Sequence, residues 1–317
     1  MMTKKEPLFV IGATKAGTTT LHALLNSHPA IRMSPVKETY HYCPDLWPVL
    51  SHIESLNLAQ MNALLQKGES RHNGLIKDLK TYQTLMASEG LERYQGEACP
   101  FYLRSTQAAA LIHAAHPNAK LIAVIRDPIQ RALSHYRMEK RDALIPDTFE
   151  EAIREEWSDH ESATLSRHGL LESGLYGEGL HRFLNYFPKN QLLILDIDHL
   201  NQRPLLDQTL SLFLKVDAEG FTDEAARLND WGQARHQGLN RFLATSGLKA
   251  LIRHVLPRGM IEAGKAHFYQ QTSSDVSEPI PKPLVKKLQD FYREDVRRLS
   301  GFLESPHPTW VDRYLKP

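Results

Sequence analysis

The sequence predicts a single α/β domain, in which helices flank a central, mostly parallel β-sheet. Short apolar runs alternate with amphipathic segments along the 317 residues, an order typical of βα units joined by right-handed crossovers. Two of these units, Phe9–Pro29 and Lys120–Arg141, each combine a buried strand, a tight polar turn and a helix. No internal repeat or low-complexity linker divides the chain, so we expect one domain over residues 1–317.

The first unit opens with an uninterrupted apolar run, Leu8–Ile11, which suits a strand buried on both faces. Thr18–Ser27 follows as a helix with three leucines on one side, and the proline at position 29 ends it. Ile31–Met33 is expected to be a second short strand. Residues 46–93 are interpreted as a polar, helical insertion to which we assign no chemistry.

The later elements follow from the same apolar periodicities. We expect strands at Gly96–Cys99, Leu121–Ile125 and Gln191–Ile197, and helices at Ser105–Ala115, Pro128–Arg141, Leu175–Tyr186, Arg203–Val216 and Lys282–Phe302. Residues 218–278 carry weaker signals of order and could cap an active site.

Composition excludes several classes of function. A net charge of +1 indicates no global basic surface for nucleic acid or an anionic membrane, so anion binding has to come from local clusters. The sixteen histidines are scattered, and Cys43 and Cys99 form no metal-ligand pattern, so we expect no metal site. We find no signal peptide and no apolar run long enough to span a bilayer, and we expect a cytoplasmic protein, with one disulfide left open.

The first turn, Gly12 to Thr19, has the glycine spacing of the nucleotide-binding pattern GxxxxGK[ST]. Thr18 occupies the position of the lysine in that pattern, and Lys15 lies inside the loop instead. This shift argues against ordinary use of ATP or GTP. The alternative is a strand-to-helix turn whose glycines serve packing only.

The second turn follows the strand that ends before Arg126. Asp127 can cap the next helix, and the proline after it suits the first helical position. Arg126 could offer a guanidinium, and Ser134 a hydroxyl, to a phosphate. We interpret Arg131 and Arg137 as solvated charges on a surface helix. Each turn thus sets a cation beside a helix N-terminus, and two such sites on neighbouring strands suit a ligand with two separated phosphate-like groups.

These motifs resemble sulfotransferases that use 3'-phosphoadenosine 5'-phosphosulfate (PAPS). ATKAGTTTLHALLNSHP is similar to the 5'-phosphosulfate loop of that superfamily, and RDPIQRALSHY to its 3'-phosphate-binding strand and helix. GEACPFYL, SGLYGEGLHRFLNYFPKNQLLILDIDHL and the C-terminal LVKKLQDFYREDVRRL followed by Trp310 also resemble family segments. The resemblance covers most of the chain except 46–93 and 218–278, and it is closest to the carbohydrate (heparan sulfate-type) branch and its bacterial relatives. It implies a P-loop-NTPase-like sulfotransferase fold.

The resemblance also implies roles for individual residues. Those expected at the 5'-phosphosulfate are Lys15, Ala16, Gly17, Thr18, Thr19 and Thr20, those at the 3'-phosphate are Arg126 and Ser134, and Arg235 could also reach the nucleotide. Sulfuryl transfer builds negative charge on the leaving oxygen. Lys15 would neutralise that charge, and no metal is implied.

A base for the acceptor is expected in PVKETYHYC, which offers Glu38 and His41. Glu38 aligns with a glutamate that the carbohydrate branch uses, and we prefer it to His41. Ala98 stands where carbohydrate enzymes often carry a lysine, so their acceptor specificity does not transfer directly.

The resulting prediction is a PAPS-dependent sulfotransferase that acts on a hydroxyl or amine, of a carbohydrate or another small metabolite, and releases adenosine 3',5'-bisphosphate (PAP). One alternative is a P-loop kinase or NTPase, which would require Mg²⁺ and the missing lysine. Another is a non-catalytic nucleotide-binding scaffold. The sequence leaves the identity of the acceptor and the oligomeric state open.

Overall fold

The computed structural model describes residues 5–88, 90–141, 144–146, 148–222, 233–234, 269–270 and 280–316. Its central sheet has five strands in the order β2-β5-β1-β6-β7, and every pairing in it is parallel. The strands are β1 (Glu6–Gly12), β2 (Ile31–Met33), β5 (Tyr94–Ala98), β6 (Lys120–Ile125) and β7 (Leu192–Asp196). This arrangement confirms the predicted α/β class with a mostly parallel sheet.

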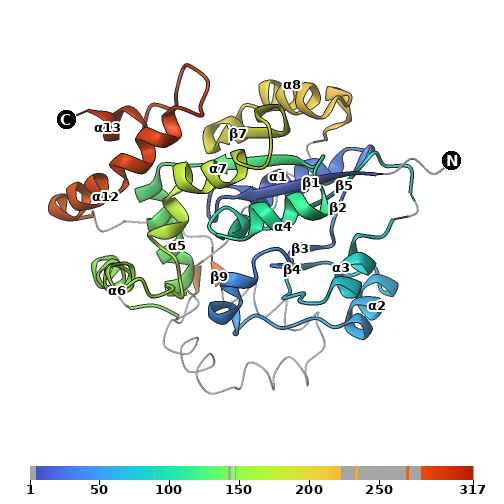
Figure 1. Ribbon diagram of the computed structural model, residues 1–317, viewed down its shortest axis with the longest axis horizontal. Helices are drawn as coiled ribbons and strands as arrows, with labels where there is room; N and C mark the ends of the chain where they lie inside the picture. Colours follow the sequence, from blue (N-terminus) through green and yellow to red (C-terminus); the bar gives the residue numbers. More distant parts are fainter. Residues whose placement is uncertain are drawn as a thin grey trace.

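Helices surround the sheet, as Figure 1 shows, with α8 beyond the β7 edge and α2 and α3 beyond β3 and β4. The helices are α1 (Thr18–Ser27), α2 (Leu58–Gln66), α3 (Leu79–Met86), α4 (Ala108–Ala115), α5 (Pro128–Arg141), α6 (Phe149–Glu161), α7 (Tyr176–Leu184), α8 (Arg203–Leu214), α12 (Lys282–Ser300) and α13 (Asp312–Leu315). The core lies between them and the sheet, whose strands are apolar because both faces are covered.

The insertion at 46–93 is only partly helical, which corrects the expectation. Besides α2 and α3 it contributes β4 (Arg71–Asn73), which pairs in parallel with β3 (Val36–Glu38) outside the main sheet. Strands of three residues carry no readable periodicity, so the sequence indicated neither.

Helix α6 was also not predicted. Its sequence does contain a start signal, because the Thr148 side chain accepts from the backbone of Glu151 and donates to its carboxylate at 2.7 Å. A threonine followed three residues later by a glutamate is the sequence signature of a helix N-terminus.

The order of the strands reverses at β1. After β1 the chain passes to β2 at one edge and returns through β5, and it then crosses to β6 on the other side of β1. Ligands of open α/β sheets bind at such a reversal, beyond the carboxyl ends of the strands. Since β1 and β6 pair directly, the two turns found in the sequence lie next to each other.

The C-terminal segment supports this edge of the sheet. Trp310 donates from Nε1 to Asp196 at the end of β7 (2.7 Å), and Arg313 donates to Asp127 just after β6 (2.6 Å). Asp295 of α12 accepts the backbone N–H groups of Gly177 and Glu178, in the first turn of α7, at 2.8 and 2.7 Å. The ends of β6 and β7 are thereby held from outside the sheet.

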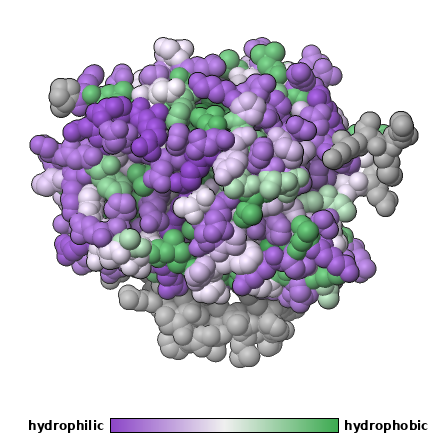
Figure 2. All heavy atoms as spheres, viewed as in Figure 1, coloured by the Kyte–Doolittle hydropathy of each residue, from purple (hydrophilic) through white to green (hydrophobic). Residues whose placement is uncertain are grey.

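The face seen in Figure 2 is mainly hydrophilic, with small apolar patches separated from one another. Among the helices of the described residues, none is long and apolar enough to span a membrane. Cys43 and Cys99 are both buried free thiols.

Candidate active site

The turn after β1 forms the N-terminus of α1 around a residue that has to be glycine. Gly17 precedes the helix with φ 94°, in the left-handed region, and a Cβ added there would lie 2.4 Å from Leu200 Cδ1. As the N-cap residue, Gly17 also supplies no side-chain acceptor, so the helix start keeps its capacity to bind an anion. Ala16 and Thr18 are buried, whereas Thr19 and Thr20 are half-buried in the first turn of α1.

The turn after β6 forms as the sequence predicts. The Asp127 carboxylate accepts the backbone N–H groups of Ile129 and Gln130 at 2.9 and 3.0 Å, which caps α5. Arg126 donates from Nη1 to the carbonyl of Lys15 at 3.5 Å, a long contact that joins the two turns. Ser134 lies two turns along α5 and is half-buried. The structure therefore brings the two predicted anion sites together.

Lys15 lies among like charges. Burial lowers the pKa of Lys15, and Arg141, Arg126 and Lys37 lower it further, while Glu38 opposes them. Its Nζ lies 3.5 Å from the sulfur of Met138, a weak acceptor. Three other cationic side chains thus act on Lys15 beside a helix N-terminus, and an anion bound next to Lys15 would relieve this repulsion.

Glu38 is the carboxylate of this cluster, and it is buried at the end of β3. Its Oε1 accepts from Lys37 Nζ at 2.8 Å and its Oε2 from the Tyr40 hydroxyl at 2.7 Å. Burial favours the neutral acid, but the charges and hydrogen bonds of its neighbours hold the pKa of Glu38 below its ordinary value. An ionised, oriented carboxylate next to a cationic pocket can act as a general base.

His72 is a neighbour of Glu38 that the sequence did not reveal. Its Nε2 lies 3.5 Å from Glu38 Oε1. It comes from β4 of the insertion, and only the pairing of β3 with β4 brings it to the site.

His41, the second predicted base, is placed differently from Glu38. Its ring stacks on Tyr82 with centroids 4.1 Å apart, and Nδ1 lies 2.9 Å from the Ile76 carbonyl. These contacts fit a residue that packs the loop after β3.

A buried carboxyl group supports that loop from β5. Glu97 accepts from the hydroxyls of Thr39 (2.5 Å), Tyr102 (2.7 Å) and Tyr82 (3.1 Å). Burial raises the pKa of Glu97 to about 7, although the three hydroxyls partly oppose burial. Because Thr39 follows Glu38, this network fixes the backbone that carries the candidate base.

Arg131 is not a solvated charge, and that interpretation was wrong. Its side chain is fully buried, donates from Nη2 to the Leu170 carbonyl, and lies 3.3 Å from Nδ1 of His135. The Tyr292 hydroxyl of α12 donates to the neighbouring Leu171 carbonyl at 3.0 Å. Arg131 and Tyr292 thus join α5 and α12 to the same short segment, Leu170 and Leu171. Arg137 is half-buried.

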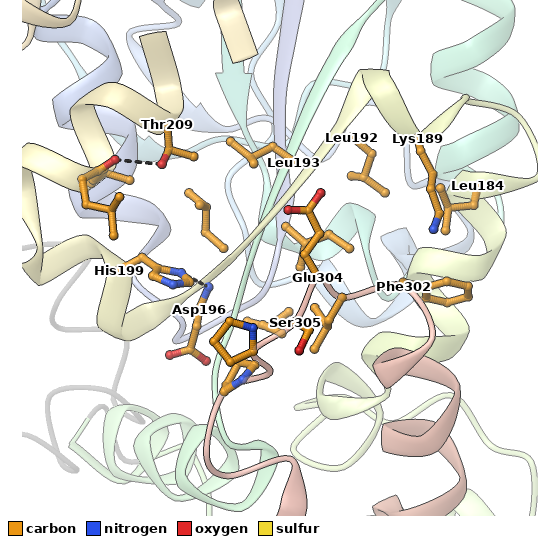
Figure 3. Close-up of a pocket in the computed structure, with 18 residues that line it drawn as sticks. Leu184, Lys189, Leu192, Leu193, Asp196, His199, Thr209, Phe302, Glu304 and Ser305 are labelled. Atoms are coloured by element: carbon orange, nitrogen blue, oxygen red, sulfur yellow. Dashed lines mark hydrogen bonds between the residues drawn. The ribbon is translucent and has the colours of Figure 1, made fainter. Parts of the chain in front are cut away.

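A pocket of about 370 Å³ lies along the edge strand β7, between α8 and the segment after α12 (Figure 3). Its walls are mostly aliphatic, and two of its polar side chains, Asp196 and His199, have partners of their own. Asp196 accepts from Trp310, and His199 accepts from the backbone of Asp196 at 2.9 Å. With Lys189 as its single lysine or arginine, this pocket lacks the cationic cluster that an anionic nucleotide needs.

Two expectations cannot be placed. Arg235 and nearly all of the segment 218–278 lie outside the described residues. Within the part of the chain that the structure describes, no group of three or more His, Cys, Asp or Glu side chains could hold a metal ion.

Comparisons with known proteins identify the family and the fold of the chain. Residues 7–171 match the family described as "Sulfotransferase family". Human (Homo sapiens) carbohydrate sulfotransferase 15 is 27% identical over 229 residues, which cover 60% of this chain and 40% of that protein. Bifunctional heparan sulfate N-deacetylase/N-sulfotransferase 4 of Mus musculus is 28% identical over 315 residues, 97% of this chain and 31% of that protein.

The chain therefore spans less than half of the length of these two relatives. Among solved structures, a sulfotransferase from Alicyclobacillus acidocaldarius superimposes with a TM-score of 0.65 at 21% identity, covering 97% of this chain and 99% of that one. This likeness supports the fold.

Proposed function

The chain belongs to the sulfotransferase family, and we propose that it transfers the sulfuryl group of PAPS to a hydroxyl or amine of a carbohydrate or another small metabolite. The observation that carries the proposal is the cationic cluster around Lys15, which adjoins a helix N-terminus and the buried carboxylate of Glu38. PAPS carries anionic groups at the 3' and 5' positions of its ribose, and these groups can bind the cationic side chains and the helix N-terminus.

The two turns would divide the donor between them. The turn that contains Lys15, Ala16 and Gly17, with Thr18, Thr19 and Thr20 of α1, would hold the 5'-phosphosulfate. Arg126 and Ser134 would hold the 3'-phosphate. The adjacency of β1 and β6 and the contact from Arg126 to the carbonyl of Lys15 support this division.

In the transfer, the acceptor oxygen or nitrogen forms a bond to sulfur while the bond from sulfur to the phosphate oxygen breaks. Negative charge then accumulates on the leaving phosphate. Lys15, which is partly desolvated, would neutralise it, and a positioned cation in such a site contributes several kcal/mol.

Glu38 would remove the proton of the acceptor. Its low pKa keeps it ionised at neutral pH, and its bonds to Lys37 and Tyr40 fix its orientation. We assign His41 to packing, because its ring stacks on Tyr82. Glu38 therefore remains our choice of base.

The acceptor class rests on the named relatives, which are a carbohydrate sulfotransferase and a heparan sulfate N-sulfotransferase. They support a sugar hydroxyl or amine. Ala98 at the end of β5 is buried and offers no charge to an acidic sugar.

The test is calorimetric titration with PAP and with ATP, each with and without Mg²⁺, followed by an acceptor screen with radiolabelled PAPS. We expect PAP to bind without metal and ATP to bind weakly. Tight, Mg²⁺-dependent binding of ATP would instead indicate a kinase or NTPase. Binding of PAP without transfer to any acceptor would indicate a nucleotide-binding scaffold.

A further inference from the structure

Strand β4 brings His72 next to the candidate base. The register of β3 with β4 pairs Val36 with Arg71 and Glu38 with Asn73, so Lys37 falls opposite His72. His72 Nε2 consequently lies 3.5 Å from Glu38 Oε1, and about half of the His72 side chain is exposed. The insertion thus supplies a titratable group to the site.

Glu38 is buried, so a neighbouring base that takes a proton from it would give that proton a route to solvent. Once it has removed the proton of an acceptor, it must lose that proton before the next turnover. The Lys37 ammonium and the Tyr40 hydroxyl both donate to Glu38, and neither is a base at neutral pH. Neutral imidazole has a free lone pair on one nitrogen. Among the described residues that contact Glu38, only His72 can accept a proton from it at neutral pH.

We propose that His72 accepts the proton that Glu38 takes from the acceptor and passes it to water, a role that rests on the proposed sulfuryl transfer. In the first step the acceptor's O–H or N–H bond breaks and its proton bonds to Glu38 Oε1. In the second step the proton moves from Oε1 to His72 Nε2, and Glu38 is again a carboxylate. The imidazolium then loses one proton to water, and exchange with water leaves the remaining hydrogen on Nδ1, so that Nε2 can accept again.

The separation of 3.5 Å fits this order of events. The two donors of Glu38 lie at 2.8 and 2.7 Å, whereas His72 Nε2 stands farther away than the ordinary 2.7–3.2 Å of a hydrogen bond. A nitrogen lone pair that faces an ionised carboxylate makes no bond, so we assign the neutral tautomer with its hydrogen on Nδ1. When Glu38 becomes protonated, a donor faces that lone pair and the bond can form.

Burial keeps His72 in its proton-accepting form. Burial lowers the pKa of His72, and the positive charges of Lys37 and Lys15 lower it further, against the opposing charge of Glu38. His22 of α1 also faces this group and is neutral, because burial lowers its pKa to about 4. His72 is therefore neutral at pH 7 and ready to receive a proton.

The test compares His72→Gln, which keeps a polar side chain but accepts no proton, with the wild type. We expect kcat to fall by about 100-fold, the lower end of what positioned proton transfer contributes, while KM for PAPS and the Kd of PAP stay unchanged. Added imidazole should restore the rate in proportion to its free base. The acidic limb that His72 contributes to the pH profile should disappear. The matched control is His160→Gln on α6, an exposed histidine whose loss should leave every parameter unchanged.

A rise in KM without a change in kcat, or a slower rate that imidazole leaves unchanged, would overturn the proposal. A second measurement does not depend on turnover. In an NMR titration the pKa of His72 should fall in Glu38→Gln, because the variant loses the anion that raises it. An unchanged His72 pKa would refute the contact itself. Failure of the sulfotransferase proposal would be recognised separately, by the absence of PAP binding or of transfer in the wild type.

Discussion

Replacement of Glu97 by glutamine should remove a large part of the pH dependence of stability. Glu97 is fully buried on β5 and is surrounded by hydroxyl groups without a cation in hydrogen-bond contact among the described residues. Its carboxyl group is therefore easier to bury protonated than ionised. Glutamine keeps its shape and stays neutral at every pH.

The size of the contribution that Glu97 makes to stability follows from two pKa values. The ordinary pKa of glutamate is 4.5, and burial raises that of Glu97 to about 7. At about 1.4 kcal/mol per pKa unit, this difference corresponds to about 3 kcal/mol of unfolding free energy. Because the pKa of Glu97 is higher in the folded state than in the unfolded state, its contribution to stability decreases as the pH rises. The contribution is complete below pH 4.5, where both states are protonated, and it is lost as the pH rises toward 7.

Urea denaturation, followed by tryptophan fluorescence at a series of pH values from about 5 to about 8, measures this contribution. Wild type should lose most of the 3 kcal/mol relative to Glu97→Gln across the series. Glu219→Gln, an exposed control, should follow the wild type. If the curves of wild type and Glu97→Gln stay parallel within about 0.5 kcal/mol, the buried network does not hold a protonated carboxyl group and the reasoning is refuted.

Three further variants test the site and its support. Glu38→Gln should lower kcat by at least about 100-fold with the Kd of PAP unchanged, and full turnover in a PAPS assay would remove Glu38 as the base. Gly17→Ala should weaken PAP binding in calorimetry and cost about 1–3 kcal/mol in urea unfolding, because alanine disfavours φ 94° and its Cβ meets Leu200; a wild-type Kd and stability would contradict this. Asp295→Asn should destabilise the fold by about 1–3 kcal/mol, since one of two backbone N–H groups at α7 loses its acceptor, and an unchanged urea midpoint would count against that cap.

The features that could be predicted from the sequence are local ones. The apolar run before each turn, the cap at Asp127 and the glycine spacing of the first turn all lie within short stretches of chain. Their physical causes, burial of a strand and satisfaction of a helix end, act over the same short range. The sheet and the adjacency of Lys15 and Arg126 followed from them.

The features that were missed depend on contacts between distant segments. His72 reaches Glu38 only because two three-residue strands pair in one register. Arg131 lies in a polar helical sequence typical of a surface, and it is buried because Leu170 and Tyr292 arrive from elsewhere in the chain. A helical charge pattern does not report which neighbour covers it, so sequence periodicity could not find either residue.

The central claim is that each turn holds one end of a single nucleotide. Calorimetry with PAP and with adenosine 5'-monophosphate, which lacks the 3'-phosphate, tests it in wild type, Arg126→Met and Lys15→Met. Wild type should prefer PAP by about 10- to 100-fold, the contribution of charge-assisted hydrogen bonds. Arg126→Met should lose this preference, and Lys15→Met should weaken both ligands equally and keep it. If the preference for PAP over adenosine 5'-monophosphate survives in Arg126→Met, or disappears in Lys15→Met, the claim that each turn binds one end of the nucleotide is contradicted.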